Sequence, residues 1–519
     1  AVVPGVMRYR LLETVAEYAA ERLDEAGDRD GTEHRHLVHY RELARTADPL
    51  LRGSGQLAAI ARFQEEYENL RTALRRAVAV RDEHEALALV LSLFWFWHMR
   101  DLRAEALHWS EAAASLGPDP FAAPVTPAPP LTVGCTDAPP PMDDGQLQEA
   151  RRGVRLIRLA TMDHQTSWWT SPDGMDELRR IRHAYRPGLP QTCRMPGALW
   201  FFAVLLTAGP DELRELLDAT VDACRRYGYA WELASALQLR ANVLANRIDW
   251  TGEASQDAEE SLEIFERLGD SWGAAEALSS RGEARERRGA FEGAAEDYRA
   301  AISYAERLGA QAQVSLLSTR YAGTLIETGR GDEGEKMLRE VVVDGRDRGY
   351  EAAPAASLYL ALWLGRTGRT EEARRELTAL REQFRSPTMA IFDGVTLGTL
   401  AWVHNLDHRY DEGLDCAVRA LAHAREPLSM LVAPQMPAIH LIAAAWAVAG
   451  AGGPRARTAT LLLGARGRLL PSGYVATPTE RENLAHAERM ARAALGDEVY
   501  DEAYAEGGGL SLEEAAALL

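Results

Sequence analysis

Glycine recurs in this chain at an interval that few folds can accommodate. A first series is spaced by 41, 40 and 40 residues: Gly228, Gly269, Gly309 and Gly349. A second series lies about twenty residues out of phase: Gly289, Gly329 and Gly368, with His408 at the next expected position. Glycine just past the end of a helix adopts the left-handed conformation at little steric cost. Each unit of about 40 residues is therefore predicted to hold two helices and two turns.

In the clearest unit, residues 271–309, large and small side chains alternate as they do in a tetratricopeptide repeat. The positions are Leu278, Gly282, Phe291, Ala294 and Ala301. In such repeats the small residues let neighbouring helices approach closely. The predicted fold class is all-α: a tetratricopeptide-like α-solenoid of antiparallel helix pairs, with repeats of about 40 residues, that forms a superhelix.

Length and composition agree with a solenoid. A chain of 519 residues is too long for one compact core, but stacked repeats bury their apolar faces against their neighbours and can keep growing. The hydrophobic content is 46% and the aromatic content 7%, and no convincing run of alternating strand residues occurs. The composition therefore suits packed helices.

Charge, cysteines and hydropathy limit where the chain can act. A net charge of −19 repels phosphate backbones and anionic lipids, so we expect neither direct nucleic-acid binding nor membrane binding. The four cysteines show no CxxC spacing, which is typical of free thiols in a reducing compartment. The longest apolar runs fall well short of the roughly 20 residues that span a bilayer. We expect a cytoplasmic location.

Four stretches resemble one family in the order in which they occur. They are MRYRLLETVAEYA at residues 7–19, EYENLRTAL at 66–74, LLLGA at 461–465 and ALGDEVYDEAYAE at 494–506. Together they resemble large bacterial STAND regulators, which are nucleotide-switched transcription factors that include SARP-type antibiotic regulatory proteins and LuxR-type ATPase regulators. The resemblance implies a C-terminal tetratricopeptide sensor or effector region, with an ATPase and a winged-helix domain upstream of this chain.

With that resemblance, six segments are predicted. They are the end of the upstream winged-helix domain with a junction helix (1–27), N-terminal helical pairs (28–117), a flexible, exposed Pro-rich insertion (118–145), degenerate helical repeats (146–228), regular repeats (229–453) and capping helices (454–519). Residues 6–11 are predicted to be a short extended segment. The insertion is predicted from nine prolines in 28 residues, because no packed helix survives that density.

No catalytic pattern is present in the sequence. It contains no Gly-rich phosphate loop, no GxSxG and no HExxH, so we expect no enzyme activity and no cofactor in this chain. His34, His36 and His39 do not share one helical face, because residues two apart point away from each other. We therefore expect no metal site.

Two aromatic features have both a packing and a ligand interpretation. The LFWFWH run at residues 93–98 has aromatic rings on both sides of one helix, which predicts a helix buried all round as a packing hub; the alternative is an aromatic ligand box. Trp231 and Trp272 occupy the same register one repeat apart. They are expected to pack between repeats as a ladder, with direct ligand stacking as the alternative.

The concave face of the predicted superhelix is the candidate binding site, because the first helices of successive pairs line an extended inner groove. The repeat register places ten polar or aromatic residues there: Ser235, Gln238, Asn242, Ser279, Glu283, Glu286, Arg287, Thr319, Arg366 and Trp402. Their mixed chemistry suits a polar small-molecule effector or an extended peptide.

The sequence thus predicts a signal-sensing region of a bacterial transcriptional regulator. Its groove would bind an effector or a protein partner and control the upstream nucleotide switch and DNA-binding domains. The alternative is a protein-interaction scaffold that holds a partner peptide without switching.

Overall fold

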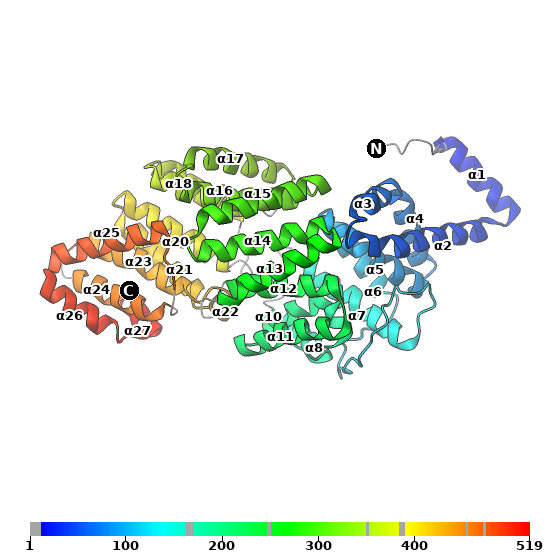
Figure 1. Cartoon of the computed structure of the whole chain (residues 1–519), viewed down its shortest axis with the longest axis horizontal. Coiled ribbons are helices and arrows are strands. Elements are labelled where there is room, and N and C mark those ends of the chain that lie inside the picture. Colours follow the sequence, from blue (N-terminus) through cyan, green and yellow to red (C-terminus); the bar gives the residue numbers. More distant parts are fainter. Residues whose placement is uncertain are drawn as a thin grey trace.

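Every regular element in the described part of the chain is a helix, as the sequence predicts. The computed structural model describes residues 12–161, 168, 171–245, 251–348, 352–383, 390–452, 455–470 and 474–519. The extended segment predicted at residues 6–11, and Gly349 of the repeat series, lie outside these residues. The helices pack one after another along an elongated molecule (Figure 1).

The chain begins with α1 (Glu13–Ala26), α2 (Arg29–Ala47), η1 (Asp48–Leu51), α3 (Gln56–Glu65), α4 (Tyr67–Ala79), α5 (Glu83–Met99) and α6 (Arg103–Ala114). Beyond residue 143 follow α7 (Asp144–Thr161), α8 (Pro172–Ala184), α9 (Pro190–Cys193), η3 (Gly197–Leu199), α10 (Trp200–Thr207) and α11 (Pro210–Tyr227). In Figure 1, α1 extends away from the body of the molecule.

The regular pairs are α12 (Ala230–Ala245) with α13 (Thr251–Leu268), α14 (Ser271–Arg287) with α15 (Phe291–Leu308), α16 (Gln311–Glu327) with α17 (Gly331–Arg348), α18 (Ala352–Arg366) with α19 (Thr370–Gln383), and α20 (Ala390–Leu406) with α21 (Tyr410–Ala424). The last helices are α22 (Pro427–Val432), α23 (Met436–Gly450), α24 (Ala456–Leu469), α25 (Pro478–Leu495), α26 (Asp497–Gly507) and α27 (Leu512–Ala517).

The repeat glycines end the helices in the predicted way. The six that the structure describes have φ between 62° and 84°: Gly228, Gly269, Gly289, Gly309, Gly329 and Gly368. His408, at the next position of the second series, also has a positive φ of 59°. The 40-residue period therefore reflects a left-handed residue after each helix, and the predicted all-α solenoid is confirmed.

The first helices of successive pairs run parallel and in register. Contacts between them join residues 37 to 42 apart: Gln238–Ser280, Gln313–Glu276, Arg320–Glu283, Arg366–Glu327 and Asn405–Ala443. Offsets that stay close to the 40-residue period from α12 to α23 mean that roughly equivalent turns lie side by side. The C-terminal ends of α14, α16, α18, α20 and α23 therefore lie at one end of the inner face, and their N-terminal ends at the other.

Replacing His408 with glycine is expected to stabilise the fold by about 1 kcal/mol. A residue with a side chain strains the left-handed conformation by roughly that amount, and glycine does not. The reverse change, Gly368→Ala at the equivalent position of the preceding repeat, should cost about 1 kcal/mol. Urea unfolding of both variants and the parent chain measures the difference, and a His408→Gly variant that is less stable than the parent would contradict the argument.

The aromatic run of α5 packs against the first regular repeats. Fourteen of its 17 residues are buried, so the prediction of a helix buried all round is confirmed. Trp95 meets Trp231 edge-on, with ring centres 5.1 Å apart, and meets Trp272 at 6.4 Å. The two repeat tryptophans are thus joined through α5, which favours the packing interpretation over a ligand box.

The Pro-rich segment is mostly exposed, but part of it packs into the core. We call residues 118–143 the strap. It forms no helix, as its prolines require, yet Phe121, Ala128 and Met142 are buried and belong to the hydrophobic core. The backbone N–H of Ala128 donates to the carbonyl of Ala184 at 2.8 Å. Most of the strap is exposed, and these three side chains are buried because proline excludes a helix but leaves an extended backbone free to bury apolar side chains.

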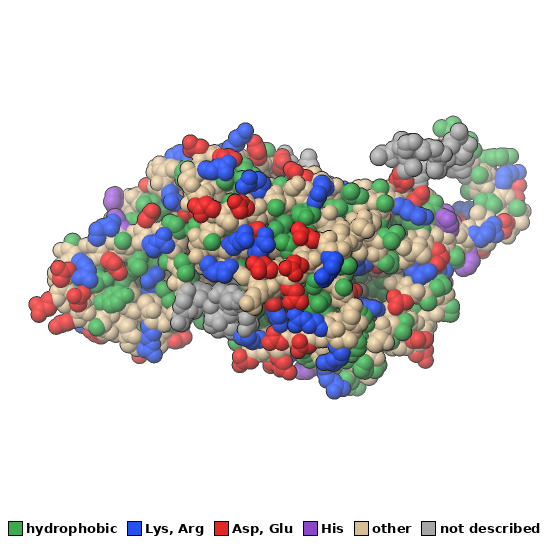
Figure 2. Space-filling model, in the orientation of Figure 1, with side chains coloured by type: hydrophobic (Ala, Val, Ile, Leu, Met, Phe, Trp, Pro, Cys, Tyr) green, Lys and Arg blue, Asp and Glu red, His purple; other side chains and the backbone are tan. Residues whose placement is uncertain are grey.

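Acidic and basic side chains are interspersed over the face of the molecule shown in Figure 2. Many of them pair across the repeat, as Arg240 does with both Asp218 and Asp257 at 2.9 and 2.7 Å. Many of the arginines therefore form ion pairs within the fold.

Candidate functional site

A cavity of about 720 Å³ lies against the first helices of the C-terminal pairs. We call it the groove cavity. Each of α16, α18, α20 and α23 lines it with residues three or four positions apart, which is one face of a helix. On α18, for example, the lining residues include Ala355, Tyr359, Leu362 and Arg366. The parallel register brings these faces together as one wall.

Six of the ten predicted site residues line the groove cavity: Glu283, Glu286, Arg287, Thr319, Arg366 and Trp402. The other four do not line it: Ser235, Gln238, Asn242 and Ser279. Two of these join α12 to α14, because Gln238 donates to the Ser280 hydroxyl at 3.1 Å and that hydroxyl donates to Asn242 at 2.9 Å. Contact of any of the ten with an effector stays a prediction.

The charged side chains of the wall are paired with each other. Arg320 lies 2.8 Å from Glu283, and Arg366 lies 2.9 Å from Glu327. Glu286 instead accepts a hydrogen bond from the Tyr298 hydroxyl at 2.8 Å. Burial raises the pKa of Glu286 to about 7, although the Tyr298 hydrogen bond and Arg320 oppose the shift. Near neutral pH this carboxyl is poised between its charged and neutral forms.

Replacing Glu286 with glutamine is expected to remove a pH-dependent part of the stability. The folded-state pKa of about 7 lies above the ordinary value of 4.5, so between these values the native chain holds more protons than the unfolded chain. The free energy of unfolding therefore falls as the pH rises through this window. Urea unfolding gives the free energy of unfolding of Glu286→Gln and of the parent at each pH. The value for the variant minus that for the parent should rise by roughly 2 kcal/mol from pH 5 to pH 8.

Glu283→Gln provides the control for that measurement. Burial opposes ionisation of Glu283, but Arg320 and Arg287 outweigh it and hold its pKa below the ordinary value of 4.5. Its contribution to stability is therefore lost only as the pH falls below that value, and it stays constant between pH 5 and pH 8. If the stability difference between Glu286→Gln and the parent is also constant between pH 5 and pH 8, Glu286 does not titrate in this window.

Sequence reasoning missed the part of the wall that comes from the end of the chain. The groove cavity is also lined by five residues at and before the start of α25, together with residues of α14 and α16: Tyr474, Val475, Thr477, Glu480 and Asn483. Thr477 and Glu480 form the capping box that the TPTE sequence signals. No repeat period connects this segment with α14, so only the folded chain reveals the contact.

The predicted set of site residues also lacked residues of α23. Met436, Ile439, His440 and Trp446 line the groove cavity next to the face of α20. The offset of the earlier pairs continues into α23, because Asn405 bonds to Ala443 38 residues on. Neither glycine series reaches this far, however, and the repeat register was not extended to these residues. The other signal in the sequence was a continuous apolar helix after Pro434.

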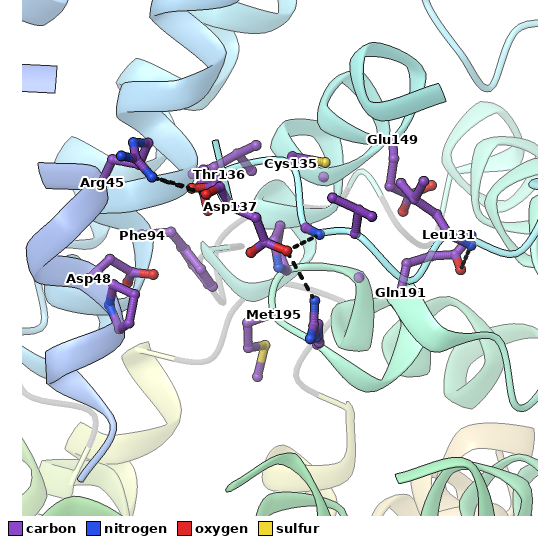
Figure 3. Close-up of a pocket in the computed structure, with 18 of the residues that line it drawn as sticks. Arg45, Asp48, Phe94, Leu131, Cys135, Thr136, Asp137, Glu149, Gln191 and Met195 are labelled. Carbon is purple, nitrogen blue, oxygen red and sulfur yellow. Dashed lines mark hydrogen bonds and ion pairs between the residues drawn. The ribbon is translucent and has the colours of Figure 1, made fainter. Parts of the chain in front are cut away.

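A second cavity, of about 560 Å³, lies between the N-terminal helices and the strap. Figure 3 shows Arg45, Asp48 and Phe94 on one side of it and the strap residues Thr136 and Asp137 on the other. The Arg45 guanidinium donates to the carbonyls of Thr136 and Asp137 at 3.3 and 3.2 Å. The strap thus closes this cavity and is held down by side chains of the helical body.

The side-chain amide of Gln191 is the other main attachment of the strap. It accepts from the backbone N–H of Leu131 at 3.0 Å (Figure 3). It also donates to the carbonyl of Pro129 at 2.7 Å. Gln191→Ala is expected to speed chymotryptic cleavage of the strap about tenfold, because it removes both bonds and the cost of local opening falls by about 1–2 kcal/mol. Gln148→Ala, at an exposed site on α7, is the control. Equal cleavage rates for the two variants would rule out this role.

The described residues contain no group of three or more histidine, cysteine, aspartate or glutamate side chains placed to hold a metal ion. Within the same part of the chain, no helix combines the length and hydrophobicity that crossing a membrane requires.

Comparison with known proteins links part of the chain to transcription regulators. The chain matches no protein-family model. It is 37% identical over 105 residues to proteins named as HTH-type transcriptional regulators, one from Mycobacterium bovis and two from strains of Mycobacterium tuberculosis. The match covers 20% of this chain and only 12% of the length of those relatives. The similarity therefore associates a segment of the chain with regulators of this kind.

Among solved structures, a circular tandem repeat protein with novel repeat topology and enhanced subunit contact surfaces aligns with 94% of this chain and 96% of its own length. The sequence identity is 14% and the TM-score 0.13. At this TM-score the likeness supports no conclusion about function.

Proposed function

We propose that this chain is the effector-sensing region of a bacterial transcriptional regulator of the STAND type, such as a SARP-type or LuxR-type ATPase regulator. A small-molecule effector would bind in the groove cavity and bias the upstream nucleotide switch and DNA-binding domains. This region itself would carry no catalytic activity and would act in the cytoplasm. The observation that carries the proposal is the groove cavity, which consecutive parallel helices build together.

The size and lining of the cavity favour a small molecule. Its volume of about 720 Å³ lies within the roughly 300–1,000 Å³ of small-molecule sites. The wall combines apolar and aromatic residues with a few polar groups, as such sites do. The segment around Tyr474 also occupies one side of the groove, which leaves less room for a long extended peptide. A sensor of small molecules therefore fits better than a peptide scaffold.

The position of the cavity offers a way to transmit binding. Its lining comes from α14, α16, α18, α20 and α23, so one ligand would contact five helices that belong to successive layers. A solenoid changes curvature through small shifts at each helix interface. A ligand that contacts several layers can therefore select one curvature, provided that it binds the two curvatures with different affinity.

A binding screen on this chain distinguishes the two functions. The purified chain is screened by thermal shift against a library of small metabolites and, separately, against a peptide library. A saturable metabolite that also changes the affinity of the full-length regulator for its DNA supports the sensor. Binding of peptides alone, with no effect on DNA affinity, contradicts the sensor and supports the scaffold.

A further inference from the structure

Two thiols from different helices are in contact near the attachment of the strap. Cys193 ends α9 and Cys224 lies in α11, 31 residues further along the chain. Their side chains form a hydrogen bond with each other. The Cys193 Sγ also donates to the carbonyl of Thr220 at 3.9 Å, and Thr220 lies about one helical turn before Cys224. The two thiols therefore meet where α9 packs on α11.

The backbone that leads to Cys193 also follows this stretch of α11. Gly188, two residues before α9, faces Ala219 and Ala223, because a Cβ atom at Gly188 would lie 3.9 and 4.0 Å from their Cβ atoms. A disulfide joins Cβ atoms about 3.8 Å apart through a sulfur–sulfur bond of about 2 Å. Thiols that already touch across two packed segments therefore need only small adjustments to form one.

The two thiols differ in reactivity. The Cys224 thiol donates the hydrogen bond between them, and this bond holds the pKa of Cys193 below its usual range although burial opposes the shift. The same bond, together with burial, raises the pKa of Cys224. Because the thiolate is the nucleophile, Cys193 is the thiol that attacks an oxidant, and Cys224 then reacts with the product.

A small oxidant can approach this pair. Gln191 and Arg194, on either side of Cys193, line the cavity of about 560 Å³ that the strap closes. Cys193 is 6% exposed, whereas Cys224 is fully buried. A molecule the size of hydrogen peroxide can therefore come close to Cys193, which is also the more reactive thiol.

We propose that Cys193 and Cys224 are a redox-sensitive pair that a hydroperoxide converts into a disulfide, and that this disulfide fastens the strap to the helices beside the repeats. The Cys193 thiolate attacks one peroxide oxygen, the O–O bond breaks and hydroxide leaves, which gives a sulfenic acid. The Cys224 sulfur then attacks the Cys193 sulfur, the S–S bond forms and the sulfenic oxygen leaves as water. Two thiols lose two electrons and two protons, and one hydrogen peroxide becomes two waters.

The helix α9 also carries the attachment of the strap. The Gln191 amide of α9 holds the strap through Leu131 and Pro129. The neighbouring helix α11 leads into α12, the first helix of the regular pairs, and packs against it. A bond from Cys193 to Cys224 would therefore tie this attachment covalently to α11. Such a crosslink suppresses openings in which α9 leaves α11.

Peptide mapping of the 519-residue chain tests the disulfide. The chain is treated with hydrogen peroxide, and the remaining thiols are capped with N-ethylmaleimide in urea. A map without reductant should contain the Cys193 peptide linked to the Cys224 peptide, and dithiothreitol should separate them. Cys135 and Cys416 should be recovered as capped thiols, because burial raises the pKa of both and leaves little thiolate.

Alanine variants assign the two roles. Cys193→Ala and Cys224→Ala should each abolish the linked peptide, whereas Cys135→Ala and Cys416→Ala, the matched controls, should form it as the parent does. Dimedone, which reacts with sulfenic acids, should label Cys193 in Cys224→Ala and should leave Cys224 unlabelled in Cys193→Ala. Circular dichroism shows that each variant is folded.

Chymotryptic cleavage tests the effect on the strap. The oxidised parent should be cleaved within residues 118–143 about fivefold more slowly than the reduced parent, because openings that separate α9 from α11 are suppressed. Cys193→Ala treated with peroxide should be cleaved at the rate of its untreated form. This variant keeps all the methionines, so it controls for their oxidation by peroxide.

Two results would overturn the disulfide: a treated chain without the linked peptide, or a linked peptide that forms as readily when the chain is first unfolded in urea. A linked chain whose strap is cleaved at the reduced rate would overturn the fastening of the strap. None of these experiments uses an effector. The proposed function fails by a different result, namely a full-length regulator whose DNA affinity responds to no ligand of this chain.

Discussion

Replacing Asp270 with alanine is expected to lower the free energy of unfolding by about 3–5 kcal/mol. The Asp270 side chain is 1% exposed and joins the N-terminal helices to the repeats. Its carboxylate accepts from the Gln56 amide at 2.7 Å, from the Trp231 indole at 2.6 Å and from the backbone N–H of Gly273 at 2.7 Å. Alanine would leave the Trp231 indole and the Gly273 N–H without this acceptor and the Gln56 amide with only its bond to the Leu51 carbonyl at 3.0 Å. Each such loss costs about 1–3 kcal/mol.

A graded series tests this role. Asp270→Asn keeps one side-chain acceptor, so its cost should be intermediate. Asp82 is the matched control, because it caps α5 through a single bond to the Glu85 N–H at 3.2 Å. Asp82→Ala should cost about 1 kcal/mol, the usual value for a helix cap. Urea unfolding followed by circular dichroism measures all three, and equal losses for Asp270→Ala and Asp82→Ala would show that Asp270 is no more than a cap.

Replacing Ala355 with tryptophan is expected to weaken ligand binding in the groove cavity by about 100-fold, equivalent to about 2.7 kcal/mol. Ala355 lies on the cavity wall, four residues before Tyr359 on α18. An indole there would fill part of the groove cavity. Because it fills a cavity and does not displace a packed core residue, the fold should be retained. In the full-length regulator the variant should no longer respond to the effector.

Ala379→Trp is the control for that change, because Ala379 is exposed on α19, away from the cavity lining. The full-length protein with this variant should respond to the effector as the parent does, and thermal unfolding should be similar for both variants. A normal effector response by Ala355→Trp would show that the groove cavity is not the sensing site.

The glycine period shows how much of this molecule could be predicted from local constraints. A left-handed residue is needed where each helix ends, so Gly289 and Gly309 mark their turns whatever they pack against. The same register placed Glu286, Arg366 and Trp402 on one face, and all three line the groove cavity. It also placed Gln238 and Asn242 on that face, where they bond to Ser280 between α12 and α14. Periodicity selects a face of a helix, but not the stretch of that face where a cavity opens.

The position of the strap, in contrast, could not be predicted from local constraints. The nine prolines predict correctly that residues 118–143 form no helix, because the constraint acts within each residue. Where the strap lies depends on Arg45 and Gln191, which are 91 and 60 residues away from the groups that they bind. No local pattern indicates such partners. The segment was therefore expected to be exposed, although part of it belongs to the core.

The sequence by itself determined the helices, their pairing and the inner face of the array, because these depend on backbone preferences and on side-chain spacing within about 40 residues. Only the tertiary structure decided that Asp270 meets Gln56, that Trp446 packs on His486, and that Tyr474 lines the same cavity as residues of α14. Such contacts depend on the small rotation between each helix pair and the next, accumulated over many pairs. The total rotation is set by the packing of all the pairs together, so the sequence of one repeat does not specify it.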